Sequence, residues 1–180
     1  MKSDLTANYI RSALDYDQDT GAFTWRKRPR EHFATQRAWN RCNARFPGTE
    51  AGTVDAYGYS KISVGHVDYL AHRLAWLYMT GEWPAAQIDH INCDKLDNRF
   101  CNLRQATNAE NIRNSRKPST NTSGLKGVSW HKPNNKWRVQ ISANGSKRHL
   151  GYFDEDKLDE AAAAYERAAK ALHGEFARVS

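Results

Sequence analysis

The chain has 180 residues, of which 39% are hydrophobic, and its mean hydropathy of −0.84 favours small modules joined by polar segments over one large core. The net charge of +7 and the isoelectric point of about 9.4 favour a polyanionic partner. No apolar run reaches the length of a membrane span and no signal peptide precedes residues 2–16, so we expect neither membrane insertion nor secretion.

The positive charge is clustered in two segments. Residues 26–45 hold seven Lys or Arg and one acid, and residues 126–149 hold six and none. Basic blocks with Trp and Tyr between them are more typical of nucleic-acid surfaces than of membrane anchors. A merely soluble basic protein is the alternative, and the clustering counts against it.

The first predicted element is a helix over Leu5–Leu14, with Thr6 or Ser3 as its N-cap, because apolar residues recur there at helical spacing. A turn at 19–21 leads to a short strand over 22–25.

Residues 26–47 are basic, carry scattered aromatics and have no clean period, which predicts an irregular loop. Either the loop is only solvated, or it is an arm that contacts DNA. We favour contacts to backbone phosphates, since Lys and Arg neutralise charge there without a fixed geometry.

The next segment, 52–67, predicts strands joined by a tight turn, and Asp68–Met79 predicts a helix that ends at 81–84. His72 falls on this helix beside its apolar face. A histidine in that position is more often packed and hydrogen-bonded than a ligand, and a direct role in a site is the alternative.

Residues 87–114 predict a β-hairpin followed by a helix. A strand over Gln87–Ile91 leads into a polar loop, and Leu103–Ala106 is the returning strand. Thr107 or Asn108 then caps a helix that begins near Ala109.

Asp89 at a strand end and Asn111 on the helix offer oxygen ligands, which suit one Mg²⁺ or Mn²⁺ ion. His90 points to the opposite face of its strand, so its neutral imidazole is a candidate general base. Asn102 would fix the imidazole or the hairpin loop by hydrogen bonds. Three arginines are candidate phosphate clamps: Arg99, Arg104 and Arg113.

Other metal sites fit this stretch less well. An EF-hand loop would need a glycine at its sixth position and a glutamate at its twelfth, and neither is present. Cys93 and Cys101 flank the loop, but four ligands at zinc spacing are not visible. With Cys42 they make an odd number of cysteines, which favours reduced thiols in a cytoplasm. Asp97–Asn98 reads as a simple turn.

The string DHINCDKLDNRFCNLRQATNAENIRN resembles the HNH family of ββα-metal endonucleases, and within it the homing branch of phages and mobile introns. The resemblance covers about 57–114. It implies that His90 is the general base, that Asp89 and Asn111 are metal ligands, and that Asn102 supports the hairpin. Many HNH enzymes have His where this chain has Asn111, and Asn is usual in the homing branch.

After a polar stretch at 115–123, three strand-like runs are followed by an amphipathic helix that Gly174 ends. The helix is expected to cover the apolar face of a three-stranded sheet. The other face would enter a major groove with six polar residues: Ser129, His131, Arg138, Gln140, Lys147 and His149. The alternative is a small packing domain whose basic face is only solvated.

The strings GLKGVSW, KWRVQI, LGYFD and AAAAYERAAKALHG resemble the plant ethylene-response-factor (apetala-type) DNA-binding domain, which reads DNA with its sheet. Ser129 stands where the plant proteins tend to have Arg, so their base preference does not carry over.

Together these features predict an α+β chain: a ββα-metal (HNH) nuclease module plus a small three-stranded antiparallel sheet packed on one helix. The predicted segments are 1–50, a helix, strand and basic segment; 51–114, the nuclease; 115–123, a linker; and 124–180, the DNA-binding domain.

The predicted function is homing-type cleavage of double-stranded DNA with one Mg²⁺ or Mn²⁺ ion, without another cofactor, in the cytoplasm of a bacterial host if a phage encodes it. A catalytically silent DNA-binding regulator and an RNA-binding module are the alternatives.

Overall fold

The computed structural model describes residues 5–115, 117, 121–143 and 145–177. The chain forms two compact units, Met1–Ala106 and Thr107–Ser180. The predicted boundary near residue 50 falls inside the first unit and the one at 114 inside the second, and the functions assigned to those segments stay predictions. None of the described helices is long and apolar enough to cross a membrane.

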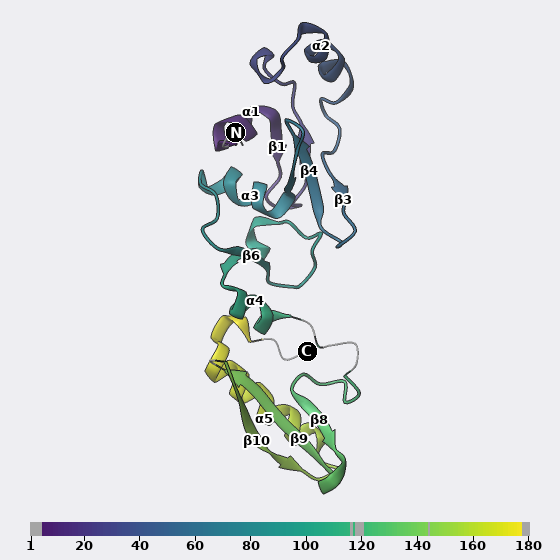
Figure 1. The fold of residues 1–180 in the computed structure, drawn as a ribbon, viewed down its shortest axis with the longest axis vertical. Coiled ribbons are helices and arrows are strands. Elements are labelled where there is room, and N and C mark those ends of the chain that lie inside the picture. The colour runs from purple at the N-terminus through teal and green to yellow at the C-terminus, as the bar shows by residue number, and fades with distance from the viewer. Residues whose placement is uncertain (1–4, 116, 118–120, 144, 178–180) are drawn as a thin grey trace. The chain divides into compact units, whose positions relative to one another are not determined.

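The first unit begins with helix α1, Ala7–Ala13 (Figure 1). Thr6 is its N-cap, as predicted, because its side chain accepts a hydrogen bond from the Tyr9 backbone N–H. Strand β1, Leu14–Tyr16, then pairs antiparallel with β2, Phe23–Trp25. The predicted helix therefore ends one residue early, because Leu14 is buried in the β1–β2 pair.

The loop predicted over 26–47 is wrong, since much of this segment is helical. A 3₁₀ turn at Arg30–His32 precedes helix α2, Gln36–Arg45, whose N-cap Thr35 accepts from the Ala38 N–H. The half-buried side of α2 carries Trp39 and Asn43 rather than an aliphatic stripe. The usual periodic signal of a helix is therefore missing from the sequence.

A three-stranded antiparallel sheet follows, in the order β3 (Thr53–Val54), β4 (Ser60–Val64) and β5 (Val67–Leu70). Helix α3 spans Ala71–Thr80 and ends at Gly81, whose φ of 87° gives the left-handed cap.

The helix predicted from residue 68 therefore starts three residues late. Asp68 pairs across the sheet with Ser63, and its carboxylate also binds Lys61 at 2.7 Å. These cross-strand contacts hold residues 67–70 extended.

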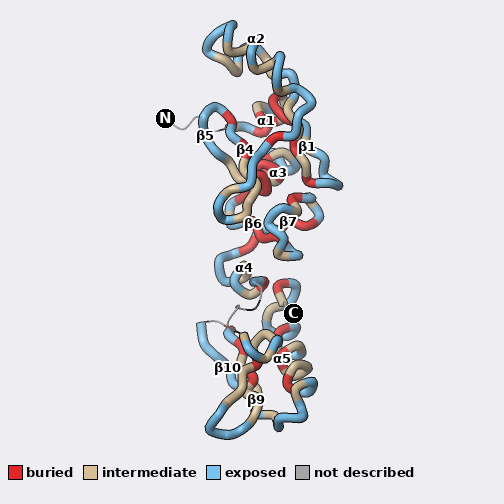
Figure 2. Tube along the Cα trace, turned by 90° about the vertical axis from the view of Figure 1, so that its right-hand side faces the viewer, coloured by how far each residue is buried: buried red, intermediate tan, exposed pale blue. Residues whose placement is uncertain are grey.

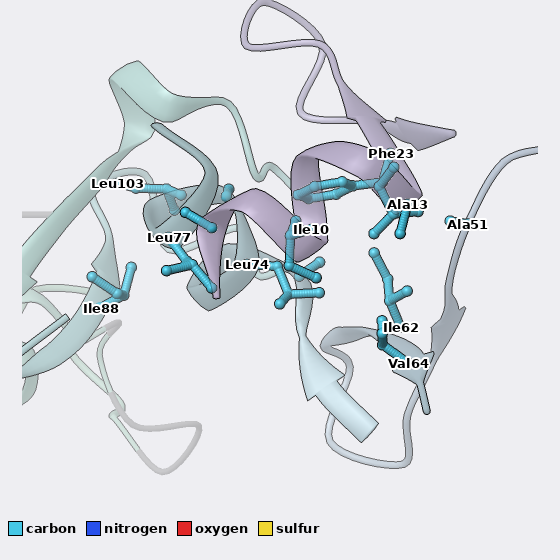
Figure 3. Close-up of a cluster of buried hydrophobic side chains, with 14 residues drawn as sticks. Ile10, Ala13, Phe23, Ala51, Ile62, Val64, Leu74, Leu77, Ile88 and Leu103 are labelled. Carbon is cyan, nitrogen blue, oxygen red and sulfur yellow. The ribbon is translucent and has the colours of Figure 1, made fainter. Parts of the chain in front are cut away.

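One core joins the elements of the first unit. Figure 3 shows side chains from α1, β2, β4, α3 and the hairpin strands meeting there. Its most buried large members are Ile10, Leu14, Ile62, Leu74 and Leu77. The hairpin that carries Asp89 contributes Ile88 and Leu103 to this core, so the packing of the unit fixes where the hairpin lies.

The second unit begins with α4, Asn108–Asn114, and continues with an antiparallel sheet in the order β10 (Ser146–Phe153), β9 (Lys136–Ala143), β8 (Val128–His131). Helix α5, Leu158–His173, ends at Gly174 and packs on the sheet. Asn144 of a predicted turn and part of the predicted linker lie outside the described residues.

Val139 and Ile141 of β9 lie buried against Ala161, Tyr165 and Ala169 of α5. Figure 2 shows buried residues both along α5 and along the strands of this sheet. The predicted α+β class, with a three-stranded antiparallel sheet on one helix, is confirmed.

Candidate active site

Asp89 and His90 lie at the end of β6, Gln87–His90, which pairs antiparallel with β7, Leu103–Ala106. The register sets Asp89 opposite Arg104 and His90 opposite Leu103. The side chains of Asp89 and His90 are 4% and 5% exposed. A carboxylate and an imidazole buried this deeply need polar partners, and the structure supplies different ones for each.

Asp89 is held by the arginine opposite it. Nε and Nη2 of Arg104 each lie 2.9 Å from Asp89 Oδ2. This arginine was predicted as a phosphate clamp, and the structure places its guanidinium on the carboxylate of its own hairpin.

His90 is hydrogen-bonded to Asn98, with 3.2 Å between Nε2 and Oδ1. Asn98 Nδ2 donates to the Leu96 carbonyl at 3.2 Å, so Oδ1 is the atom that faces the imidazole. An acceptor at this position places the proton of a neutral ring on Nε2 and its lone pair on Nδ1. Burial lowers the pKa of His90, and the Asn98 hydrogen bond and Asp89 oppose this in part. The imidazole is therefore neutral at pH 7.

Asn98 is a site residue that the sequence reading missed by assigning it to a simple turn. It is 4% exposed, and its carbonyl accepts the Tyr16 hydroxyl at 2.7 Å. Gly21, with a φ of 77°, packs so closely that a Cβ there would lie 2.6 Å from Arg99 N. Phe100 N donates to the Gln18 carbonyl at 3.3 Å. The N-terminal turn thus supports the partner of His90, and no local pattern signals such a contact.

Asn102 ties the hairpin loop together. Its Nδ2 donates to the Asp97 carbonyl at 2.8 Å and to Asn92 Oδ1 at 3.0 Å. Its Oδ1 accepts from the Asn92 backbone N–H at 3.0 Å. Of the two predicted roles, these bonds correspond to fixing the loop, and a catalytic role for Asn102 stays a prediction.

The second predicted phosphate clamp, Arg99, also binds an acid of the loop. Its Nε and Nη2 lie 2.7 and 2.6 Å from the two oxygens of Asp97. Hydrogen bonding to Arg99 lowers the pKa of Asp97 to about 2. The loop therefore contains a charge-assisted contact between two of its own residues, two positions apart.

His72 of α3 lies beside His90, with ring centroids 4.9 Å apart in an edge-on arrangement. It is 5% exposed, and burial, with the nearby His90 and Arg73, lowers its pKa to about 3. Tyr59 contacts the His72 ring at 5.5 Å. His72 is packed, as the first predicted description has it, but its Nδ1 has no hydrogen-bond partner in the described chain.

Asn111 and Arg113 lie on α4, in the second unit. The helix begins with a capping box, in which Thr107 accepts from Glu110 N while the Glu110 carboxylate accepts from Thr107 N. The pairing of Asn111 with Asp89 stays a prediction from the sequence, as do a phosphate contact by Arg113 and the identity of the ion.

The donor atoms fit a hard cation. Asp89 carries a carboxylate and Asn111 an amide oxygen, and these are the ligand types that Mg²⁺ and Mn²⁺ prefer. Within the described residues there is no cluster of three His, Cys, Asp or Glu that would hold a metal alone. Cys93 and Cys101 form no disulfide, and no such group of three gathers around them within the described residues.

The six predicted DNA-contacting residues of the second unit share one face of its sheet. Ser129 pairs with Arg138, His149 with Gln140, and Lys147 with Ser142, whereas Val139 and Ile141 between them are buried against α5. Tyr152 lies on the same face, 5.1 Å from the ring of His131 and 4.6 Å from that of His149.

Comparison with known proteins places this site in a family. The HNH endonuclease family matches residues 69–113, from β5 to α4. The chain is 41% identical over 108 residues to Protein 3.8 of Escherichia phage T7, a match that covers 59% of this chain and 87% of that protein. The chain belongs to the family of Protein 3.8 and contains an HNH endonuclease domain.

The HNH domain holds all four residues on which the resemblance rested: Asp89, His90, Asn102 and Asn111. The helix α2 and the C-terminal sheet lie outside it. The solved structure titled "DNA binding and cleavage by the HNH homing endonuclease I-HmuI" is similar with a TM-score of 0.39 and 17% identity, over 89% of this chain and 85% of that one.

Proposed function

We propose that the protein is a DNA endonuclease that hydrolyses phosphodiester bonds with one divalent metal ion. The observation that carries the proposal is the buried Asp89–His90 pair at the end of β6, inside an HNH endonuclease domain. The imidazole has a fixed partner and is neutral at pH 7, which is the state a general base needs. Asn102 keeps the loop beside it in one conformation.

In the proposed reaction His90 accepts a proton from water through Nδ1, while Asn98 holds Nε2–H and keeps the ring in this tautomer. His72 limits rotation of the ring from its side. Asp89 and Asn111 would hold Mg²⁺ or Mn²⁺, and the bound ion would supply positive charge that stabilises the phosphate in the transition state. The products are a 5′-phosphate and a 3′-hydroxyl.

We further propose that the outward face of the C-terminal sheet binds duplex DNA and favours certain sites, as an ethylene-response-factor-like domain would. Arg138 and Lys147 give this face its charge, and the Tyr152 ring lies between two histidines on it.

One observation favours the catalytically silent regulator as a second candidate. Asp89 Oδ2 is already bound by Arg104. If Arg104 stays on that oxygen when DNA and metal are present, the carboxylate has less capacity for an ion, and the chain would bind DNA without cutting it.

A cleavage assay separates the two candidates. Wild type and His90→Ala are incubated with DNA from the source genome, with Mg²⁺, with Mn²⁺ and with EDTA. His66→Asn, which changes an exposed histidine of the same unit at a positive-φ turn position, is the matched control.

We expect discrete metal-dependent cuts by wild type and His66→Asn, and none by His90→Ala, with DNA affinity nearly unchanged. Tight binding by wild type without cutting in either metal would favour the regulator. A loss of affinity in His90→Ala would make His90 structural.

A further inference from the structure

The positive charge of the first unit is concentrated in one segment. Residues 26–45 carry seven basic residues and one acid, whereas the rest of Met1–Ala106 carries seven basic residues and eleven acids. Without this segment the unit that holds Asp89 and His90 would be acidic, and it would repel a polyanion. The segment therefore gives the nuclease unit its attraction for DNA.

Helix α2 is hydrogen-bonded on one side to the segment that precedes it. Trp39 Nε1 and Asn43 Nδ2 donate to the Arg28 carbonyl at 2.9 and 2.8 Å, and Arg28 N donates to Asn43 Oδ1 at 2.9 Å. The Arg28 guanidinium lies 4.6 Å from the ring centres of both Trp25 and Phe33. One side of α2 therefore contacts its own unit, and the opposite side faces outward.

The outward side of α2 is a row of arginines. Arg37, Arg41 and Arg45 recur at intervals of four residues, which places them on one helical face. All three are exposed, and no residue of α2 is buried, as Figure 2 also shows.

These arginines are not neutralised by the protein. In the described parts of the chain, Arg37 and Arg41 make no ion pair or hydrogen bond through their side chains, and Arg45 only covers the Phe46 ring at 5.3 Å. Other arginines of the same unit do bind acids: Arg26 binds Asp15, Arg99 binds Asp97 and Arg104 binds Asp89. A row of guanidinium groups that have no acidic partner among the described residues is suited to an external anion.

We propose that α2 lies in the major groove of duplex DNA, with Arg37, Arg41 and Arg45 on backbone phosphates. This inference rests on the proposed DNA substrate. Eight residues of helix span about 12 Å, and the B-form major groove, about 12 Å wide, admits an α-helix.

The contacts are to phosphates rather than to bases. The amides of α2 that might read bases are engaged with neighbours: Gln36 accepts from Arg30 Nε at 3.1 Å and donates to Asn40 Oδ1 at 2.9 Å. Arginine, by contrast, forms bidentate bonds with phosphate oxygens.

The helix fits other polyanions less well. A membrane surface would require large apolar side chains beside the basic face, and the outward face of α2 has only alanine there. The major groove of A-form RNA is deep and narrow and does not admit a helix.

The test compares Arg37→Gln/Arg41→Gln/Arg45→Gln with wild type in EDTA, where no cutting occurs. Binding to a DNA duplex and to an RNA duplex of the same sequence is measured by fluorescence anisotropy over a range of salt concentrations. The control Lys157→Gln/Arg167→Gln/Lys170→Gln removes three charges from α5 and its N-cap, on the side of the second unit away from its proposed DNA face. Replacing the three α2 arginines with Lys keeps the charge.

We expect the slope of log affinity against log salt for the DNA duplex to fall by about 2–3 in the α2 Gln variant and by much less in the Lys and α5 variants. The slope for the RNA duplex should not change. All variants should unfold at the wild-type temperature, since α2 buries none of its residues.

An unchanged DNA slope would overturn the proposal, and so would an equal fall on DNA and RNA, because an A-form groove cannot seat the helix. The same proteins are then assayed with Mg²⁺. If wild type does not cleave but the salt slope changes as expected, the proposed nuclease activity is wrong. The proposed contact of α2 with DNA is then still supported.

Discussion

Arg104 and Asp89 face each other across the β6–β7 hairpin, and two nitrogens of the guanidinium lie 2.9 Å from one carboxylate oxygen. The side chains are 13% and 5% exposed, so the pair is almost removed from water. Removing one partner of such a pair leaves a buried charge alone, which costs more than the pair itself contributes.

We therefore expect Arg104→Ala to lower the free energy of unfolding by about 3–5 kcal/mol in urea denaturation. Arg26→Ala is the control, because its partner Asp15 and Arg26 itself are about half exposed, and its effect should be about 1 kcal/mol or less. Equal effects of the two substitutions would mean that Asp89 is not buried as described.

Asn102→Ala should loosen the hairpin loop. The substitution removes the side-chain bonds to Asn92 and to the Asp97 carbonyl and leaves buried groups without partners, at a cost of about 1–3 kcal/mol. DNA cleavage should fall with it, since the same loop carries Asn98. Asn8→Ala, at an exposed helix position, should leave both stability and cleavage near wild type. Wild-type cleavage by Asn102→Ala would show that the activity does not depend on the hydrogen bonds of Asn102.

Two glycines allow a matched test of the contact beneath the loop. Gly21 and Gly48 have φ angles of 77° and 78°, so alanine strains the backbone equally at both, by about 1–2 kcal/mol. Only at Gly21 does a Cβ meet other atoms, at 2.6 Å from Arg99 N and from the Asn98 carbonyl carbon. Gly21→Ala should therefore lower the melting temperature more than Gly48→Ala, and it alone should slow cleavage. A similar loss of activity in both would refute the coupling to Asn98.

His72 should make stability depend on pH on the acid side. Its pKa is lowered to about 3 in the folded chain, mainly by burial, whereas an unfolded histidine titrates near 6.5. The unfolded state therefore binds more protons between these values, and stability falls as pH decreases from 6.5 towards 3.

His72→Phe keeps a ring beside His90 but cannot take up a proton. Its free energy of unfolding should therefore fall less on acidification than that of wild type, by up to about 1.4 kcal/mol per pH unit. Urea denaturation of both proteins at pH 7.5 and pH 5 checks the prediction. Parallel losses in wild type and variant would exclude His72 as the source.

Local spacing was enough to predict much of the hairpin, α4 and the C-terminal sheet and helix. The β7 strand occupies the predicted residues, and Thr107 caps α4 as expected. These elements are bounded by turn and cap residues a few positions away, so short stretches of sequence determine them.

What the sequence did not reveal depends on contacts between distant residues. Helix α2 was missed because a backbone carbonyl holds its inner side, where an aliphatic stripe would have been visible. Arg104 was read as a phosphate ligand because only the strand register shows which acid lies opposite it. Asn98 was read as a turn residue because its support comes from Tyr16 and Gly21.

The hydrogen bond from Tyr16 to Asn98 joins residues 82 positions apart, so the β6–β7 hairpin depends on residues far from it in the sequence. A graft of residues 51–114 onto another scaffold would carry His90 and Asn98 but lose the tyrosine, the Gln18 carbonyl and the Gly21 surface beneath them. A transplanted segment that keeps these contacts to the hairpin loop would have to begin before Tyr16.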